Sequence, residues 1–315
     1  MKKWLIAFII FFLLVTALLY LFIPNVVSLN RSTSVKANAE GLYRSLTIDK
    51  WKNWWPETNN THTTVSLGHN LYLSGNTYTI DDRIINPLFI SISGNKISAK
   101  TLLHIIPLKI DSVKLAWTGS VATSGNPLVR IQRYFRLKKI ESDIEKILEQ
   151  MNLYFSKNEN IYDLHIKQES VVDSILISTF AISSSYPTIP FIYELINQLN
   201  HYARSNSATA TGNPMLNITT KDSINFLTRV AIPVNKRLKD SGNISYKRML
   251  GGGKILVTEI KGGPHSIKEG FTKMEYYVND YKHLAPAIPF QSLVTDRMKE
   301  PDTIKWITKI FWPVM

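Results

Sequence analysis

The stretch DSINFLTRVAIPV at residues 222–234 decides the fold of the second half of the chain, because it recurs at residues 302–314 as DTIKWITKIFWPV. The two stretches align without a gap at an offset of 80 residues. At the same offset ILIS at 175–178 matches ILVT at 255–258, and Phe191 matches Phe271. One offset kept through strand-like and helical stretches predicts an internal repeat, that is, two copies of a strand–helix–strand unit.

Each copy contains an amphipathic helical stretch. Thr188 is a capping residue type ahead of the first stretch, and Ser266 with Glu269 predicts a capping box for the second. The apolar stripes are Phe191, Ile192, Leu195, Ile196, Leu199 and Tyr202 in the first copy, and Ile267, Phe271, Met274, Val278, Tyr281 and Leu284 in the second. Each helix covers one face of its strands, so we expect the copies to pair about a pseudo-twofold axis.

The first half predicts an antiparallel sheet followed by a long helix. Asn38 is expected to cap a short helix, and the stretch from Lys139 to Tyr154 carries apolar residues at helical spacing. The predicted strands are 32–36, 63–66, 71–80, 88–93, 96–106, 113–121 and 129–137, separated by turn residues such as Ser74-Gly75-Asn76. The fold class is therefore α+β.

The N-terminus predicts a single membrane-spanning helix. After Lys2 and Lys3, residues 4–23 are apolar apart from Thr16 and Tyr20. Twenty residues span about 30 Å, the thickness of a bilayer core. A signal peptide is the alternative, but no small-x-small cleavage site follows. The balance of basic residues slightly favours a cytoplasmic N-terminus, which places the soluble part on the non-cytoplasmic side.

The length of 315 residues suggests about two domains beyond the anchor, and cysteine is absent, which excludes disulfides, thiolate metal sites and a cysteine nucleophile. The net charge is +13, and its densest cluster, Arg130, Arg133, Arg136, Lys138 and Lys139, spans a predicted strand-to-helix junction. No DNA- or RNA-binding signature accompanies it. We therefore expect no nucleic acid partner; the alternatives for the charge are acidic lipid headgroups and a solvated surface.

No catalytic constellation is apparent in the sequence. The seven histidines show no metal-ligand spacing, and no Gly-x-Ser-x-Gly motif occurs. The run Gly251-Gly-Gly253 lacks the lysine of a phosphate loop, and it is interpreted as a hairpin turn between residues 246–250 and 254–261. These patterns predict no metal and no cofactor, and they favour a binding protein over an enzyme.

Two resemblances follow from these stretches. Residues 257–265 (VTEIKGGPH), 212–215 (GNPM) and the two strands ending in Ile-Pro-Val and Trp-Pro-Val resemble the gyrase-inhibitor-like domain, the effector-binding half of AraC- and MerR-type regulators. That resemblance implies a groove between the repeats for small, often cationic and aromatic ligands. Many relatives place a glutamate before the last aromatic strand, whereas residues 289–296 here contain none.

The first half resembles the helix-grip fold of START and polyketide-cyclase-like proteins, through residues 34–43 and the tryptophan-rich turn at 51–56. This resemblance implies a cavity between sheet and long helix, either open or filled by side chains. The expected domains are an anchor at 1–24, a helix-grip domain at 28–165 and a gyrase-inhibitor-like domain at 166–315.

The predicted function is a membrane-anchored protein that binds a small amphipathic or aromatic ligand in the groove of the second domain and the bilayer through residues 4–23. The candidate ligand-binding residues are Met215, Arg229, Tyr246, Glu259, Trp306 and Lys309. If the twin residues Arg229 and Lys309 face the groove, they favour an anionic or neutral ligand. Strand alternation places Trp306 and Trp312 on one face and Phe311 on the other.

Two alternatives remain open at this stage. Glu259 is a candidate base for a hydrolase acting on a lipid-like or electrophilic molecule, since some members of the resembling family hydrolyse reactive small molecules. The other alternative is a lipid-handling protein that uses the helix-grip cavity.

Overall fold

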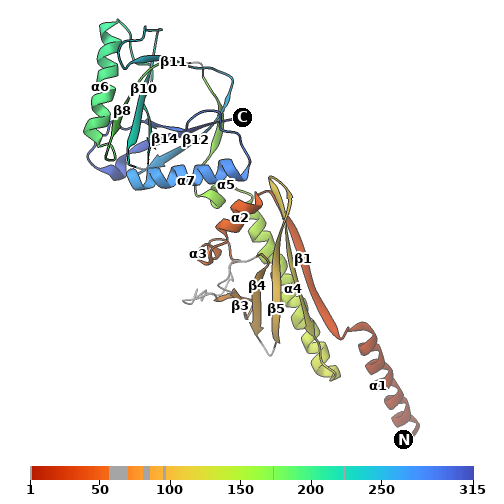
Figure 1. Cartoon of the computed structure of the whole chain (residues 1–315). Coiled ribbons are helices and arrows are strands. Elements are labelled where there is room, and N and C mark those ends of the chain that lie inside the picture. Colours follow the sequence, from red (N-terminus) through yellow and green to blue (C-terminus); the bar gives the residue numbers. More distant parts are fainter. Residues whose placement is uncertain (1, 57–69, 81–85, 95–96, 173, 223) are drawn as a thin grey trace. The chain divides into compact units, whose positions relative to one another are not determined.

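A computed structural model of the chain describes residues 2–56, 70–80, 86–94, 97–172, 174–222 and 224–315 (Figure 1). The chain divides into two compact units, Met1–Ile161 and Tyr162–Met315. The predicted strand at 63–66 lies outside the described residues. The architecture is α+β, with one antiparallel sheet in each unit.

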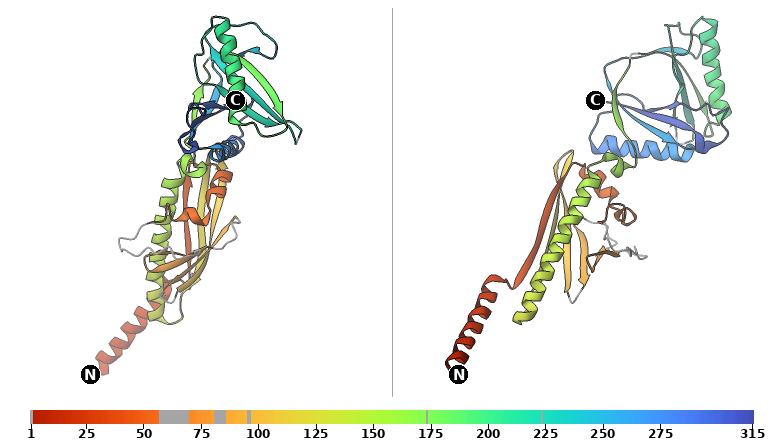
Figure 2. Two further views of the ribbon diagram at one scale, coloured as in Figure 1. Left: turned by 90° about the vertical axis from the view of Figure 1, so that its left-hand side faces the viewer. Right: turned by 180° about the vertical axis from the view of Figure 1, so that it is seen from behind.

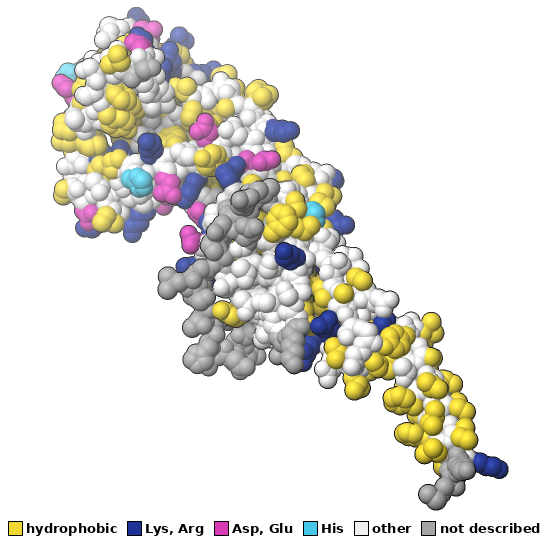
Figure 3. Space-filling model, turned by 60° about the horizontal axis from the view of Figure 1, so that its bottom comes forward, with side chains coloured by type: hydrophobic (Ala, Val, Ile, Leu, Met, Phe, Trp, Pro, Cys, Tyr) yellow, Lys and Arg dark blue, Asp and Glu magenta, His cyan; other side chains and the backbone are white. Residues whose placement is uncertain are grey.

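Helix α1 (Lys2–Phe22) opens the first unit. Its window Lys3–Phe22 has a mean hydropathy of 3.0, and none of it is buried. Figure 3 shows its apolar side chains, in yellow, gathered along this helix. Among the described residues this is the one helix long and apolar enough to cross a membrane, a test that an N-terminal signal sequence also passes.

The first unit is built on a six-stranded antiparallel sheet in the order β1-β6-β5-β4-β3-β2. The strands are β1 (Val26–Val35), β2 (Asn70–Leu73), β3 (Asn76–Ile80), β4 (Leu88–Gly94), β5 (Ile97–Lys109) and β6 (Ser112–Ala122). The strand predicted at 71–80 is a hairpin instead. Ser74 and Gly75 adopt φ of 53° and 83°, and two consecutive positive φ values turn the chain sharply.

The helices of this unit are α2 (Ala39–Ser45), α3 (Ile48–Trp51), α4 (Pro127–Phe155) and α5 (Asn158–Tyr162). Asn38 caps α2 as predicted, because its side chain accepts hydrogen bonds from the Glu40 and Gly41 amides. The predicted strand at 129–137 is wrong, since these residues are the first turns of α4. Asn126 caps that helix and Pro127 occupies its first position, two signals that start a helix. The basic cluster therefore lies on one helix.

Helix α4 covers the sheet with the apolar face predicted from its spacing. The buried apolar residues of this face are Leu137, Ile140, Ile144, Ile147, Leu148, Met151 and Phe155. Aromatic side chains occupy the space between sheet and helix: Trp51, Trp54, Trp55, Tyr78, Trp117 and Phe155, each at most 7% exposed. Their rings pack at centroid distances of 4.7–6.5 Å. Side chains thus occupy the region where the helix-grip resemblance implies a cavity.

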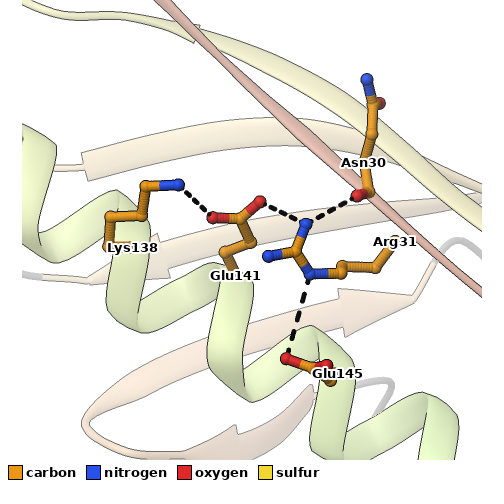
Figure 4. Close-up of polar contacts among 5 residues, drawn as sticks. All are labelled: Asn30, Arg31, Lys138, Glu141 and Glu145. Atoms are coloured by element: carbon orange, nitrogen blue, oxygen red, sulfur yellow. Dashed lines mark hydrogen bonds and ion pairs between the residues drawn. The ribbon is translucent and has the colours of Figure 1, made fainter. Parts of the chain in front are cut away.

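An ion-pair network joins α4 to the first strand (Figure 4). Arg31 of β1 donates to the buried carboxylate of Glu141 at 2.6 Å, and Lys138 donates to the other oxygen of Glu141 at 2.8 Å. Two cations on one buried carboxylate leave it paired, which a lone buried charge requires. The network fixes the long helix against β1.

The end of α1 is bonded into this unit by Arg130 of α4, which is only 3% exposed. Its Nε donates to the Ile23 carbonyl at 2.9 Å, its Nη2 donates to the same oxygen, and its Nη1 donates to Asn25 Oδ1 at 2.7 Å. The guanidinium lies 4.6 Å from the ring centroid of Tyr20, whose hydroxyl donates to the Gly125 carbonyl. The cation therefore meets the carbonyl end of α1, where a helix dipole favours positive charge.

The second unit is an eight-stranded sheet in the order β11-β8-β10-β9-β13-β14-β12-β7 (Figures 1 and 2). Its strands are β7 (Lys167–Ser170), β8 (Ser174–Ser183), β9 (Met215–Thr220), β10 (Phe226–Val234), β11 (Ser245–Met249), β12 (Lys254–Lys261), β13 (Phe290–Leu293) and β14 (Ile307–Val314). Helix α6 (Ile189–Ser205) packs on β8 and β10, and α7 (Pro264–Asp280) packs on β12 and β14 (Figure 1).

The offset of 80 residues is kept between β10 and β14, where the fully buried Thr228 and Thr308 correspond, and between the first residues of β8 and β12. The two helices begin 75 residues apart, at Ile189 and Pro264. Connecting loops explain the change: residues 184–188 precede α6 but only 262–263 precede α7, whereas 294–306 between β13 and β14 replace 221–225.

Two finer predictions in this unit are wrong. Helix α7 begins at Pro264 after Gly263, which has no side chain for capping, so Ser266 and Glu269 form no capping box. The glycine run 251–253 does not join a hairpin, since β11 pairs with β8 while β12 pairs with β14 and β7. The Gly252 amide donates instead to the carbonyl of Val171, the residue that follows β7.

Candidate functional site

The sheet of the second unit has two distinct faces, because strand side chains alternate. One face packs on the helices: Val230 and Ile232 of β10 belong to the core beneath α6. On the α7 side a Cβ at Gly270 would lie 2.8 Å from Ile260 and 3.0 Å from Ile310, so that helix approaches its strands closely. We call this the helix face, and the other the opposite face.

Four of the predicted site residues lie on the opposite face. Met215 pairs with Ala231 and Ser292, and Arg229 pairs with Asn217, whose Oδ1 accepts from its guanidinium at 3.0 Å. Glu259 and Lys309 are exposed and stand directly across from each other on β12 and β14. A stacked aromatic pair, Phe290 and Phe311, shares this face at 5.1 Å between centroids.

The other two predicted residues lie on the helix face. Tyr246 pairs with Ile177, a core residue under α6, and the Arg237 guanidinium covers its ring at 4.7 Å. Trp306 is 4% exposed, and Trp312 packs against Phe271 of α7. The six candidates therefore do not line one site, and their role in ligand binding stays a prediction.

The helix face carries a group of polar and aromatic side chains near the seam of the sheet, where β9 pairs with β13. We call this the seam cluster: Tyr193, Gln291, Arg297, Trp306 and Thr308. Arg297 Nη2 donates to Gln291 Oε1 at 2.9 Å and to Thr308 Oγ1 at 3.0 Å. The guanidinium carbon lies 4.8 Å from the Trp306 ring centroid, and the Arg297 amide donates to the Tyr193 hydroxyl at 2.6 Å.

Arg297 is a buried cation held by neutral partners. It is 8% exposed, and burial lowers the pKa of its guanidinium. Among the described residues no carboxylate forms an ion pair with it. Its Nε and Nη1 have no hydrogen-bond partner in that part of the chain, yet neither atom is fully enclosed. Three N–H donors of this guanidinium therefore have no hydrogen-bond partner among the described residues.

Two tyrosines stand near this charge. Burial raises the pKa of Tyr193 in α6, while the hydrogen bond from the Arg297 amide acts to lower it. Burial also raises the pKa of Tyr186, and the Arg297 charge opposes that rise. Tyr186 is 59% exposed and packs edge-on against Phe226. Both hydroxyls are neutral at physiological pH and can donate or accept.

Sequence reasoning found Trp306 but missed the rest of the seam cluster. Arg297 and Trp306 lie in loop 294–306 outside any strand, where no periodicity marks a side chain as inward-facing. The stretch 289–296, noted for having no glutamate, contains β13 and provides Gln291 as the partner of Arg297. The one available signal was the longer spacing between β13 and β14 than between β9 and β10.

No family model matches this sequence, and no curated protein matches it. Several solved structures are similar to this chain in the arrangement of their elements. EcmrR matches in a DNA complex (20% identity, TM-score 0.43, 60% of this chain and 72% of that one) and as its C-terminal domain (18%, 0.42, 48% and 98%). SAV2435 bound to tetraphenylphosphonium matches at 13% identity and a TM-score of 0.36, over 48% of this chain and 94% of that one.

The Zhui aromatase/cyclase from Streptomyces sp. R1128 matches at 12% identity with a TM-score of 0.30, over 40% of this chain and 90% of that one. The architecture given above stands on strand order and register.

The prediction that excludes nucleic acid as a partner is wrong. EcmrR, which is similar to 60% of this chain, is described in a complex with DNA. The prediction rested on the absence of a recognisable binding motif, and a motif search covers only known elements. The sequence therefore does not exclude nucleic acid.

Proposed function

We propose that this is a membrane-anchored protein whose second unit binds a small molecule at the seam cluster. The observation that carries the proposal is the buried Arg297 guanidinium, stacked on Trp306 beside Tyr193, with donors left over. Binding sites typically combine aromatic walls with a few convergent polar groups, often where two substructures meet.

The proposal includes a duplicated domain with pseudo-twofold symmetry. Supporting it, the strand order reads alike from both ends, with β8, β10 and β9 in one half and β12, β14 and β13 in the other. Each half carries one helix, and the buried pair Ile192 and Leu199 of α6 corresponds to Ile267 and Met274 of α7. The seam cluster then lies where the copies meet, as a groove between repeats requires.

We further propose that α1 stays attached as a single-pass anchor. A cleaved signal sequence has no reason to be built into the folded protein, whereas Arg130 bonds to Ile23 and stacks on Tyr20. Lys2 and Lys3 before the span and only Arg31 and Lys36 shortly after it favour a cytoplasmic N-terminus. The soluble part is accordingly proposed to lie on the non-cytoplasmic side.

A thermal-shift screen of the full chain in phosphatidylcholine nanodiscs tests ligand binding. A ligand at 100 times its Kd adds about 2.7 kcal/mol of stability, which for a unit of this size raises Tm by roughly 5–10 °C. Hits should lose most of the shift in Tyr186→Ala and keep it in Tyr276→Ala, a matched change at an exposed tyrosine of α7. A diverse library without hits, or hits equally sensitive to both variants, would refute the proposed site.

A further inference from the structure

We infer that the seam cluster selects a ligand carrying an anion, such as a carboxylate attached to an aromatic body, and that Arg297 binds this anion. The inference rests on the proposed function and adds the ligand's chemical class. It comes from the charge balance around one guanidinium.

The buried charge of Arg297 has a cost in free energy. A cation taken out of water is expensive unless it is paired or fully hydrogen-bonded. Arg297 is 8% exposed, and the partners of its guanidinium, Gln291, Thr308 and the Trp306 ring, are all uncharged. An anion at this place would restore a charge partner that the described residues do not supply.

The direction of the remaining donors also matters. Nη2 donates to Gln291 and Thr308, which orients the guanidinium, while Nε and Nη1 have no hydrogen-bond partner among the described residues. A guanidinium held in place by neutral acceptors and stacked on an indole is already oriented before an anion arrives. Pre-orientation of this kind reduces the entropy lost on binding.

The surroundings of the incoming group matter as well. The Arg297 charge opposes the rise in the pKa of Tyr186, whose hydroxyl can donate or accept a hydrogen bond. The rings of Tyr186 and Phe226, at 5.5 Å between centroids, offer an apolar wall for the body of the ligand. A cationic ligand of the same shape would meet a like charge at close range, which disfavours it.

The site occurs once in each chain. Arg297 and Trp306 belong to loop 294–306, whereas the corresponding connection in the first half is only residues 221–225. The first half therefore has no equivalent of this arginine–tryptophan stack in its shorter loop. One chain accordingly binds one anion at this site, although two halves of similar topology form the sheet.

Isothermal titration calorimetry with three probes of one shape tests the inference on the full chain in phosphatidylcholine nanodiscs. The probes are 2-naphthoate, its neutral amide 2-naphthamide, and the cation 2-naphthylmethylammonium. We expect 2-naphthoate to bind at one site per chain and at least about tenfold more tightly than the other two. Arg297→Gln should weaken 2-naphthoate by roughly 30-fold or more and leave 2-naphthamide unchanged.

The matched control is Arg229→Gln, which removes the same charge from the opposite face and should change the affinity for 2-naphthoate less than threefold. If Arg297→Gln fails to fold, the ranking of the three probes on the unaltered protein still decides. Equal or tighter binding of the cation or the amide would overturn the inference while sparing the proposed function. Failure of every probe, together with a screen without hits, would overturn both.

Discussion

Replacing Arg130 by Met should detach the end of α1 from the first unit. The change removes two hydrogen bonds to the Ile23 carbonyl, one to Asn25 Oδ1 and the stacking on Tyr20. Hydrogen bonds from a charged group contribute about 1.5–3 kcal/mol each, but three bonds from one side chain do not add fully. Methionine keeps part of the packing of the stem, so we expect a loss of about 3 kcal/mol.

The assay is thermal unfolding of the full chain in nanodiscs, combined with hydrogen exchange of peptides covering residues 20–30. A loss of about 3 kcal/mol corresponds to a Tm lower by roughly 6–12 °C for the transition of the first unit, with faster exchange at Ile23 and Asn25. Arg133→Met is the matched control on the same helix, since Arg133 Nη1 donates one hydrogen bond of 3.1 Å to the Thr123 carbonyl, and its loss should cost about 1 kcal/mol. Equal effects of the two variants, or unchanged exchange in Arg130→Met, would refute the reasoning.

Three further outcomes are expected. Gly270→Val should destabilise the second unit by about 1–3 kcal/mol, although it removes a glycine from a helix, because the added carbons would clash with Ile260 and Ile310. Chemical denaturation measures this change, and a variant more stable than the unaltered protein would contradict the close packing. Burial lowers the pKa of His283, so below about pH 6.5 the unfolded state binds more protons than the folded state, and the free energy of unfolding should fall as the pH drops through that value. This dependence should be weaker in His283→Gln. A pH series of denaturation curves in which the free energy of unfolding changes equally with pH in both proteins would contradict this. Asn38→Ala should cost the first unit about 1 kcal/mol by removing the α2 cap, and a cost below about 0.3 kcal/mol in denaturant titrations would count against it.

The elements that the sequence predicts well are those whose period and cap agree. Helix α6 follows Thr188, whose side chain caps it, and its apolar stripe is buried as expected. The stretch 129–137 fails because its apolar residues fit neither period clearly, and the cap at Asn126 decides for a helix. Local hydrogen bonding outweighed the apparent alternation.

The candidate site was harder to predict, because its residues are brought together by loop geometry. Alternation correctly separates Phe311 from Trp312, which packs on α7. It cannot show that Arg229 faces away from the helices, since that depends on which side α6 packs. Arg297 lies in loop 294–306, where no regular period indicates direction. Its burial follows only from the contacts of the folded unit.

The central claim is that a small molecule binds beside Trp306 in the second unit. Fluorine NMR of the full chain labelled with 5-fluorotryptophan tests it directly, since the chain has seven tryptophans and Trp306→Phe assigns one signal. On titration with 2-naphthoate we expect a saturable shift of the Trp306 signal, larger than that of any other tryptophan signal. Saturable binding that moves the signals of Trp51, Trp54 or Trp55 and leaves Trp306 unmoved would contradict it.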